Sequence, residues 1–243
     1  QHVRAFGAAT RPADVDFGGV QAVLSDLIIS ITEETDNLDA LTREGLARPV
    51  QQVLMRELWL LDLCMQLVSA PFAEGSPFTK ADIRGGNRAL HITCRLSQHL
   101  LWHMLRGCTV NRMYAARYVP KLTTLLGYGI GVAGTLTEIF TDNEALLDKI
   151  DDSTIRTFLE LIRADGGRHA RYVDFLICLC HASGKAVRHN QWRICRMLID
   201  EAPELLLKLS HDKARGVMVE GHPKYFPALG ASTPSQRSSG GAA

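Results

Sequence analysis

The sequence predicts an all-α protein whose short antiparallel helices stack as an armadillo-like, irregular helical solenoid or bundle. Apolar residues recur at helical spacing along most of the chain, whereas no segment shows sustained apolar–polar alternation of period two. No hairpin signal separates two strand-like runs. Glycine, proline and polar residues divide the chain into segments of about 8–20 residues, the usual length of globular helices.

In the first half of the chain, helix boundaries follow from prolines and glycines. The first helix begins near Val20, while Pro49 and Pro71 bound the second, since proline fits the first turn of a helix but not its interior. Gly107 ends the third helix, and Pro120 kinks or breaks the fourth. The predicted ranges are 20–31, 49–70, 89–106 and 111–126.

Shorter helices are predicted in the second half of the chain. Asp142 or Asn143 is the expected N-cap of one helix and Ser153 of another, because such side chains accept hydrogen bonds from first-turn amides. Gly166 and Gly184 end the helices that precede them. The predicted ranges are 135–140, 144–150, 153–163, 171–182, 189–199 and 204–209.

Three regions are expected along the chain. Residues 1–15 form a loose leader, residues 16–212 one helical domain and residues 213–243 a disordered tail, because the chain beyond Gly221 has few apolar anchors. The chain begins with Gln1 rather than Met, so we expect a fragment of a longer protein. No signal-peptide pattern and no run of about 18 apolar residues is present, so we expect no membrane contact by this part.

Composition excludes two broad classes of protein. The 243 residues include 27 Lys and Arg against 26 Asp and Glu, which gives a formal net charge of +1. With 46% hydrophobic and 22% charged residues, the chain has enough apolar surface to fold, so disorder is excluded as its main state. Its near-neutral balance provides no broad attractive field for phosphates, so we expect no nucleic-acid partner.

Cysteines and one histidine pair are the candidates for a metal site. The six cysteines lie among Leu, Ile and Met, which favours mostly buried free thiols in a reducing compartment. Cys178 and Cys180, two positions apart on a predicted helix, point to different faces. His99 and His103 are one helical turn apart, but the sequence offers neither the Glu of H-E-x-x-H nor an evident third ligand. We predict no metal and no cofactor.

Gly129, Gly131 and Gly134 match the G-x-G-x-x-G pattern of dinucleotide-binding turns. That motif needs a strand before it, whereas residues 118–126 have a helical pattern and include Pro120. A glycine-rich turn between helices is therefore preferred, and a nucleotide-binding enzyme is an alternative. No nucleophile–base pair or facing pair of carboxylates is recognisable, so no catalytic residue is predicted.

A resemblance to a known family rests chiefly on residues 169–195. The stretches that carry it are HARYVDFLICLC (169–180), SGKAVRHNQ (183–191) and IC (194–195), supported by LGYG (126–129), TLTEIFTDNEALLDKI (135–150), LMRE (54–57), SAPF (69–72), ITCRL (92–96) and LR (105–106). Together they resemble the RIH domain, the homology domain of ryanodine and inositol trisphosphate receptors, and most of all the first RIH domain of the latter. The resemblance covers about residues 20–210.

The resemblance implies a non-enzymatic, armadillo-like domain of an intracellular calcium-release channel, on the cytosolic face of the endoplasmic reticulum membrane. In such channels, which are homotetramers, the domain couples conformational change in the ligand region to the pore. Its implied partners are other domains of the same chain and neighbouring subunits. A free-standing armadillo-like scaffold for protein–protein interaction is the alternative from another class.

The resemblance also implies a site for inositol trisphosphate, made of basic and tyrosine side chains. The matching positions here are Arg56, Arg112 and Tyr114, whereas Pro49 and Val53 stand where the family has basic residues. Each charge-assisted contact to a phosphate contributes about 1.5–3 kcal/mol, so the loss of several favours structural coupling over tight ligand binding.

Overall fold

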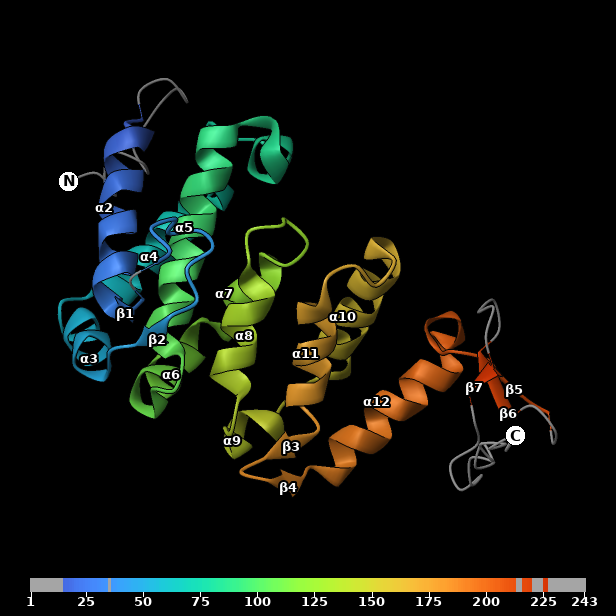
Figure 1. Cartoon of the computed structure of the whole chain (residues 1–243). Helices are drawn as coiled ribbons and strands as arrows, with labels where there is room; N and C mark the ends of the chain where they lie inside the picture. Colours follow the sequence, from blue (N-terminus) through green and yellow to red (C-terminus); the bar gives the residue numbers. More distant parts are fainter. Residues whose placement is uncertain (1–14, 35, 213–215, 220–224, 227–243) are drawn as a thin grey trace, which may run out of the picture. The chain divides into compact units, whose positions relative to one another are not determined.

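The computed structural model describes residues 15–34, 36–212, 216–219 and 225–226 (Figure 1). The predicted all-α class is confirmed, because helices dominate and no strand in the described residues exceeds four residues. These residues divide into two compact units, one ending at Cys195 and one beginning at Arg196. Apart from Val15, the predicted leader lies outside the described residues.

The helices and strands have the following bounds. The α-helices are α2 (Phe17–Ile31), α3 (Pro49–Glu57), α4 (Leu60–Ser69), α5 (Arg88–Leu105), α6 (Thr109–Ala115), α7 (Val119–Thr124), α8 (Val132–Phe140), α9 (Glu144–Leu147), α10 (Asp152–Asp165), α11 (Ala170–Cys178) and α12 (Arg188–Asp200). Short helical turns are η2 (Ala70–Phe72), η3 (Asp82–Gly86), η4 (Ala116–Tyr118) and η5 (Pro203–Leu205). The strands are β1 (Thr32–Glu33), β2 (Leu46–Ala47), β3 (His181–Ala182), β4 (Lys185–Ala186), β5 (Leu209–Asp212), β6 (Gly216–Val219) and β7 (Tyr225–Phe226).

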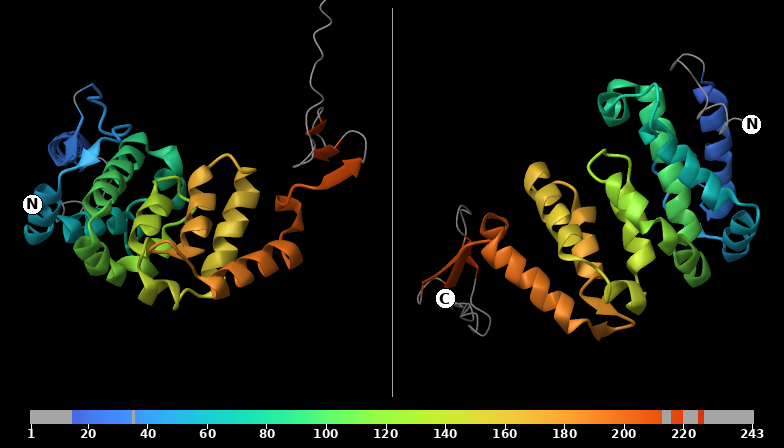
Figure 2. Two further views of the ribbon diagram at one scale, coloured as in Figure 1. Left: turned by 60° about the horizontal axis from the view of Figure 1, so that its bottom comes forward. Right: turned by 180° about the vertical axis from the view of Figure 1, so that it is seen from behind.

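Helix α5 is the centre of the first unit. It packs against α2, α4 and α8, while α8 also packs against α11 and α11 against α10, so the helices form a stack (Figures 1 and 2). Leu90, Leu100 and Met104 of α5 are completely buried. Farther along the stack, the rings of Phe158 and Phe175 lie face to face with centroids 3.9 Å apart. The core is therefore a series of helix–helix contacts, as a solenoid requires.

Two helix caps in the second half refine the predicted boundaries. Asp151, not Ser153, caps α10, and its carboxylate accepts a hydrogen bond from the amide of Thr154 at 2.7 Å. The prediction of Ser153 was wrong because the helix begins earlier, where a carboxylate also interacts favourably with the helix dipole. Asn143, one of two predicted candidates, caps α9 by accepting from the amide of Leu146.

The predicted helix over residues 49–70 is two helices, α3 and α4. Trp59 between them has a left-handed backbone (φ 62°), and its side chain is 66% exposed. This conformation costs a bulky residue about 1–2 kcal/mol. The break allows both α3 and α4 to contact α5, and those contacts offset the cost. Residues 111–126 are likewise divided among α6, η4 and α7.

Short hairpins correct the expectation that no hairpin is present. The predicted helix over 171–182 ends at Cys178, and β3 pairs antiparallel with β4 through a two-residue turn. Ser183 and Gly184 in that turn both have positive φ, at 49° and 75°, which matches the twist of a tight hairpin. A second hairpin, β1 with β2, pairs Thr32 with Ala47.

The second unit also differs from the predicted pattern. The helix expected over 204–209 is wrong, since only the single turn η5 forms before β5 begins. β5, β6 and β7 form an antiparallel sheet in that order. β6 and β7 fall within residues 213–243, where a disordered tail was expected. The rest of that segment lies outside the described residues, and the division into regions stays a prediction.

Arg43 joins the loop before α3 to α5. It is 2% exposed, and its guanidinium donates hydrogen bonds to the hydroxyl of Thr32 and to the carbonyls of Glu34 and Asn37. Its own carbonyl accepts from Nε2 of His99 at 2.7 Å and of His103 at 3.0 Å. Because a carbonyl can only accept, an imidazole donates to it from a protonated Nε2.

We expect Arg43→Ala to lower the free energy of unfolding by about 3 kcal/mol, because it leaves several buried carbonyls without donors. Urea denaturation measures this loss. The control is Arg48→Ala, whose side chain forms only a 3.8 Å ion pair with Glu33 near the surface. That pair contributes at most about 0.5 kcal/mol. Equal losses in the two variants would contradict the structural role of Arg43.

Candidate functional site

The predicted site residues lie around the C-terminal end of α5, where side chains from α3 and α6 meet it. The last carbonyls of a helix have no partner within the helix. Here Gln52 Nε2 donates to the carbonyls of His103 and Arg106, both at 2.7 Å, and Asn111 Nδ2 donates to that of Met104 at 2.8 Å. Buried amides therefore fix both shorter helices to the end of α5, and the sequence analysis missed both of them.

Arg112 is bound on two sides by the protein. Its Nε donates to the carbonyl of Leu105 at 3.2 Å, and Nη2 forms an ion pair with Glu138 Oε2 at 2.6 Å. The side chains of this pair are only 13% and 16% exposed. Arg112 thus connects α6 to both α5 and α8, and a ligand would have to compete with Glu138 for its charge.

Tyr114 belongs to a cluster around the carboxylate of Asp62. Its hydroxyl donates to the two carboxylate oxygens at 2.9 and 2.8 Å, and the hydroxyl of Tyr118 donates to the same group. The hydrogen bond to Asp62 raises the pKa of Tyr114, and burial is the main cause of the raised pKa of Tyr118. Arg117 lies over the Tyr114 ring, 3.8 Å from its centroid. Both phenols therefore remain protonated donors that connect α6 and η4 to α4.

Arg56, near the end of α3, forms an ion pair with its neighbour Glu57, and its own side chain is 16% exposed. Its positive charge acts to lower the pKa of Tyr114, which places the two residues within electrostatic range. The structure therefore brings Arg56 and Tyr114 to one end of the stack, whereas Arg112 is turned toward α8. Val53 is 39% exposed, so an apolar side chain occupies the surface where the family resemblance implies a basic contact.

The histidine pair forms part of the core. Nε2 of His99 and Nε2 of His103 are 3.1 Å apart, and both face the carbonyl of Arg43. Burial lowers the pKa of both imidazoles, that of His103 to about 3, and the nearby charges of Arg43 and Arg106 act in the same direction on His103. Within the described residues, no group of three or more His, Cys, Asp or Glu side chains is arranged to hold a metal ion.

The cysteines are all free thiols. Cys64, Cys94 and Cys178 are buried. Cys108 and Cys180 are partly buried and Cys195 is exposed, so full burial holds for three of the six. Burial raises the pKa of Cys64 and Cys94 to about 12, which makes them unreactive side chains of the core.

The glycine pattern of residues 129–134 leads into α8 and follows α7, not a strand. The dinucleotide-binding interpretation is therefore wrong, because the strand that the motif requires is replaced by a helix. The preferred interpretation, a turn between helices, is confirmed. Gly129 and Gly131 have positive φ values of 73° and 96°, which a non-glycine residue would adopt only with strain.

Because His103 is neutral in the fold, the stability of the protein should fall in mild acid. The unfolded imidazole has a pKa near 6.5 and the folded one about 3, so the unfolded state binds the extra proton across this window. The contribution of neutral His103 to stability is fully present above about pH 6.5, and it is lost as the pH falls toward 3. Between pH 7 and pH 5 we expect a loss of about 2 kcal/mol, measured by urea unfolding.

Two variants distinguish the effect of His103 on the pH dependence of stability from that of other histidines. His103→Phe is expected to be less stable at pH 7 but to show a shallower pH dependence, while substitution of exposed His181 by Gln leaves the slope unchanged. A His103→Phe protein with the full wild-type slope would disprove the assignment.

The Arg112–Glu138 ion pair should stabilise the fold. Removing one partner with Arg112→Gln or Glu138→Gln is expected to cost about 1–3 kcal/mol, because the other charge remains largely buried and unpaired. A double-mutant cycle isolates the coupling energy of the pair. Strictly additive losses would mean that the pair contributes nothing. The exposed Arg196–Asp200 pair, four residues apart on α12, provides a control with expected coupling of about 0.5 kcal/mol or less.

Sequence comparison finds known proteins that are similar to most of this chain. An inositol 1,4,5-trisphosphate receptor of Caenorhabditis elegans, itr-1, is 25% identical over 191 residues, which cover 73% of this chain and 6% of the receptor. Inositol 1,4,5-trisphosphate receptor-like protein A of Dictyostelium discoideum is 24% identical over 194 residues, or 78% of this chain and 6% of that protein. The chain thus spans a small part of these relatives.

Within the described residues, no helix combines the length and the apolar character needed to span a bilayer. The family described as RIH domain matches residues 21–210, which include every helix from α3 to α12 and most of α2. This chain therefore belongs to the RIH domain family.

Proposed function

We propose that the chain is the RIH domain of an intracellular calcium-release channel of the inositol trisphosphate and ryanodine receptor type. The observation that carries the proposal is the RIH match over residues 21–210, and the two receptor relatives support it. The channel is a homotetramer in the endoplasmic reticulum membrane, and this domain lies on its cytosolic face. The domain catalyses no reaction and contacts other domains of its own chain and of neighbouring subunits.

Its mechanism is conformational coupling along the helix stack. Close-packed helices move as units, and ties between successive helices make a displacement at one end felt at the other. Arg112–Glu138 supplies such a tie between α6 and α8. Farther along, Arg193 on α12 donates to Asp152 at the start of α10 and, at 2.9 Å, to the carbonyl of Ile150.

Arg56, Arg112 and Tyr114 are proposed to face inositol trisphosphate at the α3–α6 end. A ligand there has to compete with protein carboxylates that already bind these groups, above all Glu138. With Val53 in place of a basic side chain, the site offers few phosphate contacts. Weak ligand binding and a mainly coupling role follow from this arrangement.

Calcium efflux from vesicles that contain the full-length protein tests both the coupling role and the ligand site. Asp152→Asn weakens the α10–α12 tie and is expected to lower maximal efflux about two- to thirty-fold without changing the half-maximal inositol trisphosphate concentration. Arg56→Gln is expected to raise that concentration about tenfold or more, because a charge-assisted contact is lost.

The control for Asp152→Asn is Asp148→Asn, which removes only a long contact of 3.7 Å to His189 between two half-exposed side chains. Efflux should be unchanged in that variant. No calcium efflux from the full-length protein would overturn the channel proposal. Efflux with an unaltered half-maximal concentration in Arg56→Gln would remove Arg56 from the ligand site.

An apolar surface supports the scaffold as a second candidate. Val50, Leu54 and Leu58 of the α3 region are each more than half exposed, as is Trp59. An exposed patch of this kind is typical of a protein-binding surface. If the full-length protein conducts no calcium, this surface makes protein–protein interaction the better hypothesis.

A further inference from the structure

A cavity of about 640 Å³ lies in the first unit, between α5, the turn that begins α8, and the α10–α11 pair. Leu125, Ile130 and Leu161 contribute apolar walls, and Trp102 and Tyr172 contribute aromatic ones. None of the residues that the family resemblance assigns to inositol trisphosphate lines it. The cavity is therefore separate from the site described above, and it is large enough for a small organic molecule.

The first residues of α8, which follow the glycine turn, line this cavity. Gly131 is the N-cap of the nine-residue helix, and no side chain caps it. Gly131, Val132 and Ala133 all line the cavity. The first amides of a helix have no acceptor within it, and they carry the positive end of the helix dipole. Backbone donors with partial positive charge are thus present on one wall.

Gln98 supplies an independent sign of a missing ligand. This side chain lines the cavity and is 1% exposed. Its Oε1 accepts a hydrogen bond from the hydroxyl of Thr135 at 2.7 Å, but its Nε2 has no partner. A buried donor without an acceptor is costly. Because less than 1 Å² of Nε2 is accessible, a ligand relieves this cost when the amide turns toward the cavity and donates to it.

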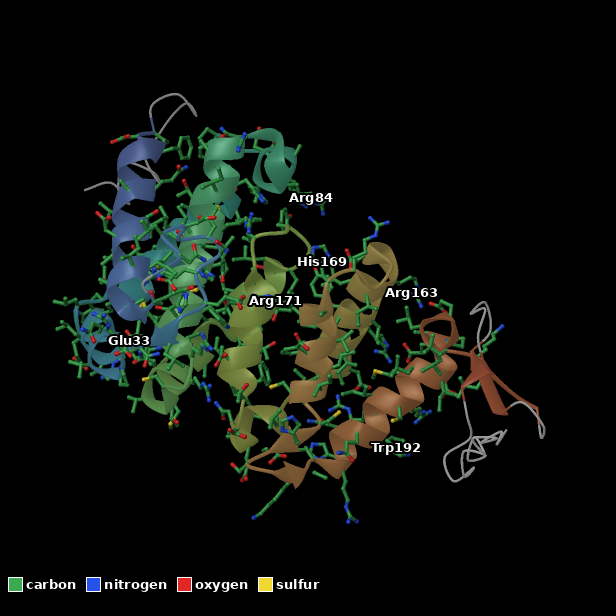
Figure 3. All side chains as sticks on the ribbon, viewed as in Figure 1. Glu33, Arg84, Arg163, His169, Arg171 and Trp192 are labelled. Carbon is green, nitrogen blue, oxygen red and sulfur yellow. The ribbon has the colours of Figure 1, made fainter. Side chains whose placement is uncertain are left out.

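Arg171 from α11 completes the donor set. Its Nη1 lies only 2.6 Å from the position that a Cβ on residue 134 would occupy, so Gly134 leaves room for the guanidinium beside the first turn of α8. Arg171 is labelled in Figure 3. Its guanidinium lies over the ring of Trp102, 5.5 Å from the ring centroid. Arg95 also lines the cavity, and within the described residues no hydrogen bond or ion pair of Arg95 is found.

The cavity also contains two carboxylates, and each has a partner. Glu44 contacts Arg171 at 3.5 Å, a long ion pair between two half-exposed side chains. Asp165 accepts hydrogen bonds from the backbone amide of His169, at 2.6 Å, and from its ring. Glu44 can turn toward solvent when an anion takes its place, because such exposed pairs contribute little.

We propose that this cavity binds a small phosphomonoester whose organic part is apolar or aromatic. The polar groups that converge on it are mainly donors: the first amides of α8, the amide of Gln98 and the guanidinium of Arg171. A phosphoryl group presents three terminal oxygens, which such a set of donors can share. The leucine, isoleucine and aromatic walls accommodate the organic part. This binding does not depend on the proposed channel function.

Titration of the chain with phenyl phosphate, followed by ¹⁵N NMR, tests the proposal. The backbone amides of Val132 and Ala133 and the side-chain amide of Gln98 should shift, and phenol should cause no shift. Arg171→Gln is expected to raise the Kd about tenfold or more, because it removes a charge-assisted contact. Gly134→Ala should also raise it, since the new Cβ displaces the guanidinium without removing its charge.

Arg188→Gln is the control, because Arg188 is exposed and lies outside the cavity. The Kd of this variant should be that of the unmodified chain. A Kd raised equally in Arg188→Gln, or unaltered in Arg171→Gln and Gly134→Ala, would overturn the proposal, since binding would then be a diffuse attraction of anions. If Arg171→Gln does not fold, the Kd of Gly134→Ala for phenyl phosphate tests the proposal in its place.

A phosphomonoester can be a free metabolite or the headgroup of a lipid, and a sedimentation experiment distinguishes them. Sedimentation with vesicles of phosphatidylcholine and phosphatidic acid, lost in Arg171→Gln, would identify a lipid source. Binding of phenyl phosphate without sedimentation would identify a free molecule. Failure of both to bind would overturn the proposal.

Discussion

The C-terminal carbonyls of α5 must find donors inside the protein, and the arrangement of the surrounding helices depends on this constraint. α5 has 18 residues and is buried along much of its length, so water cannot supply those donors. Gln52 from α3, with Asn111 and Arg112 from α6, supplies them. Because these side chains come from different helices, satisfying one helix end also positions α3 and α6. Arg43 performs the corresponding task for the loop between α2 and α3.

The same constraint bears on the phosphate site proposed at the α3–α6 end, because its donors already have partners in the protein. A donor that satisfies a helix carbonyl or a buried carboxylate is already in use, as Arg112 is with Leu105 and Glu138. Tyr114 likewise donates to Asp62. The binding free energy of a ligand would include only the difference between its own contacts and those that it displaces. The number of basic residues in a sequence is therefore a poor measure of how many are available to a ligand.

Sequence alone could predict the helices whose apolar spacing is regular, because that pattern reports burial directly. The helix predicted over 89–106 matches α5 closely. Gly166 ends α10 as predicted, and its backbone is left-handed. The break at Trp59 has no local signal, since tertiary contacts impose it. The partners of Arg112 and Tyr114 come from α8 and α4, and such long-range pairing is not encoded in local spacing. Only the position of Gln52, one turn from buried Met55 on the inner face of α3, could have indicated its role.

The glycine pattern shows how a motif can be wrong as a fold signature and still be chemically informative. Its usual setting is a strand followed by a helix, and that setting is absent before α8 within the described residues. The physical properties of the glycines remain, because they depend only on local backbone. Gly131 begins a helix without a side chain that would cap its amides, and Gly134 leaves space for the guanidinium of Arg171. A helix start, a buried amide and an arginine thus converge without a sheet, so the donors of an anion site arise here from helix packing alone.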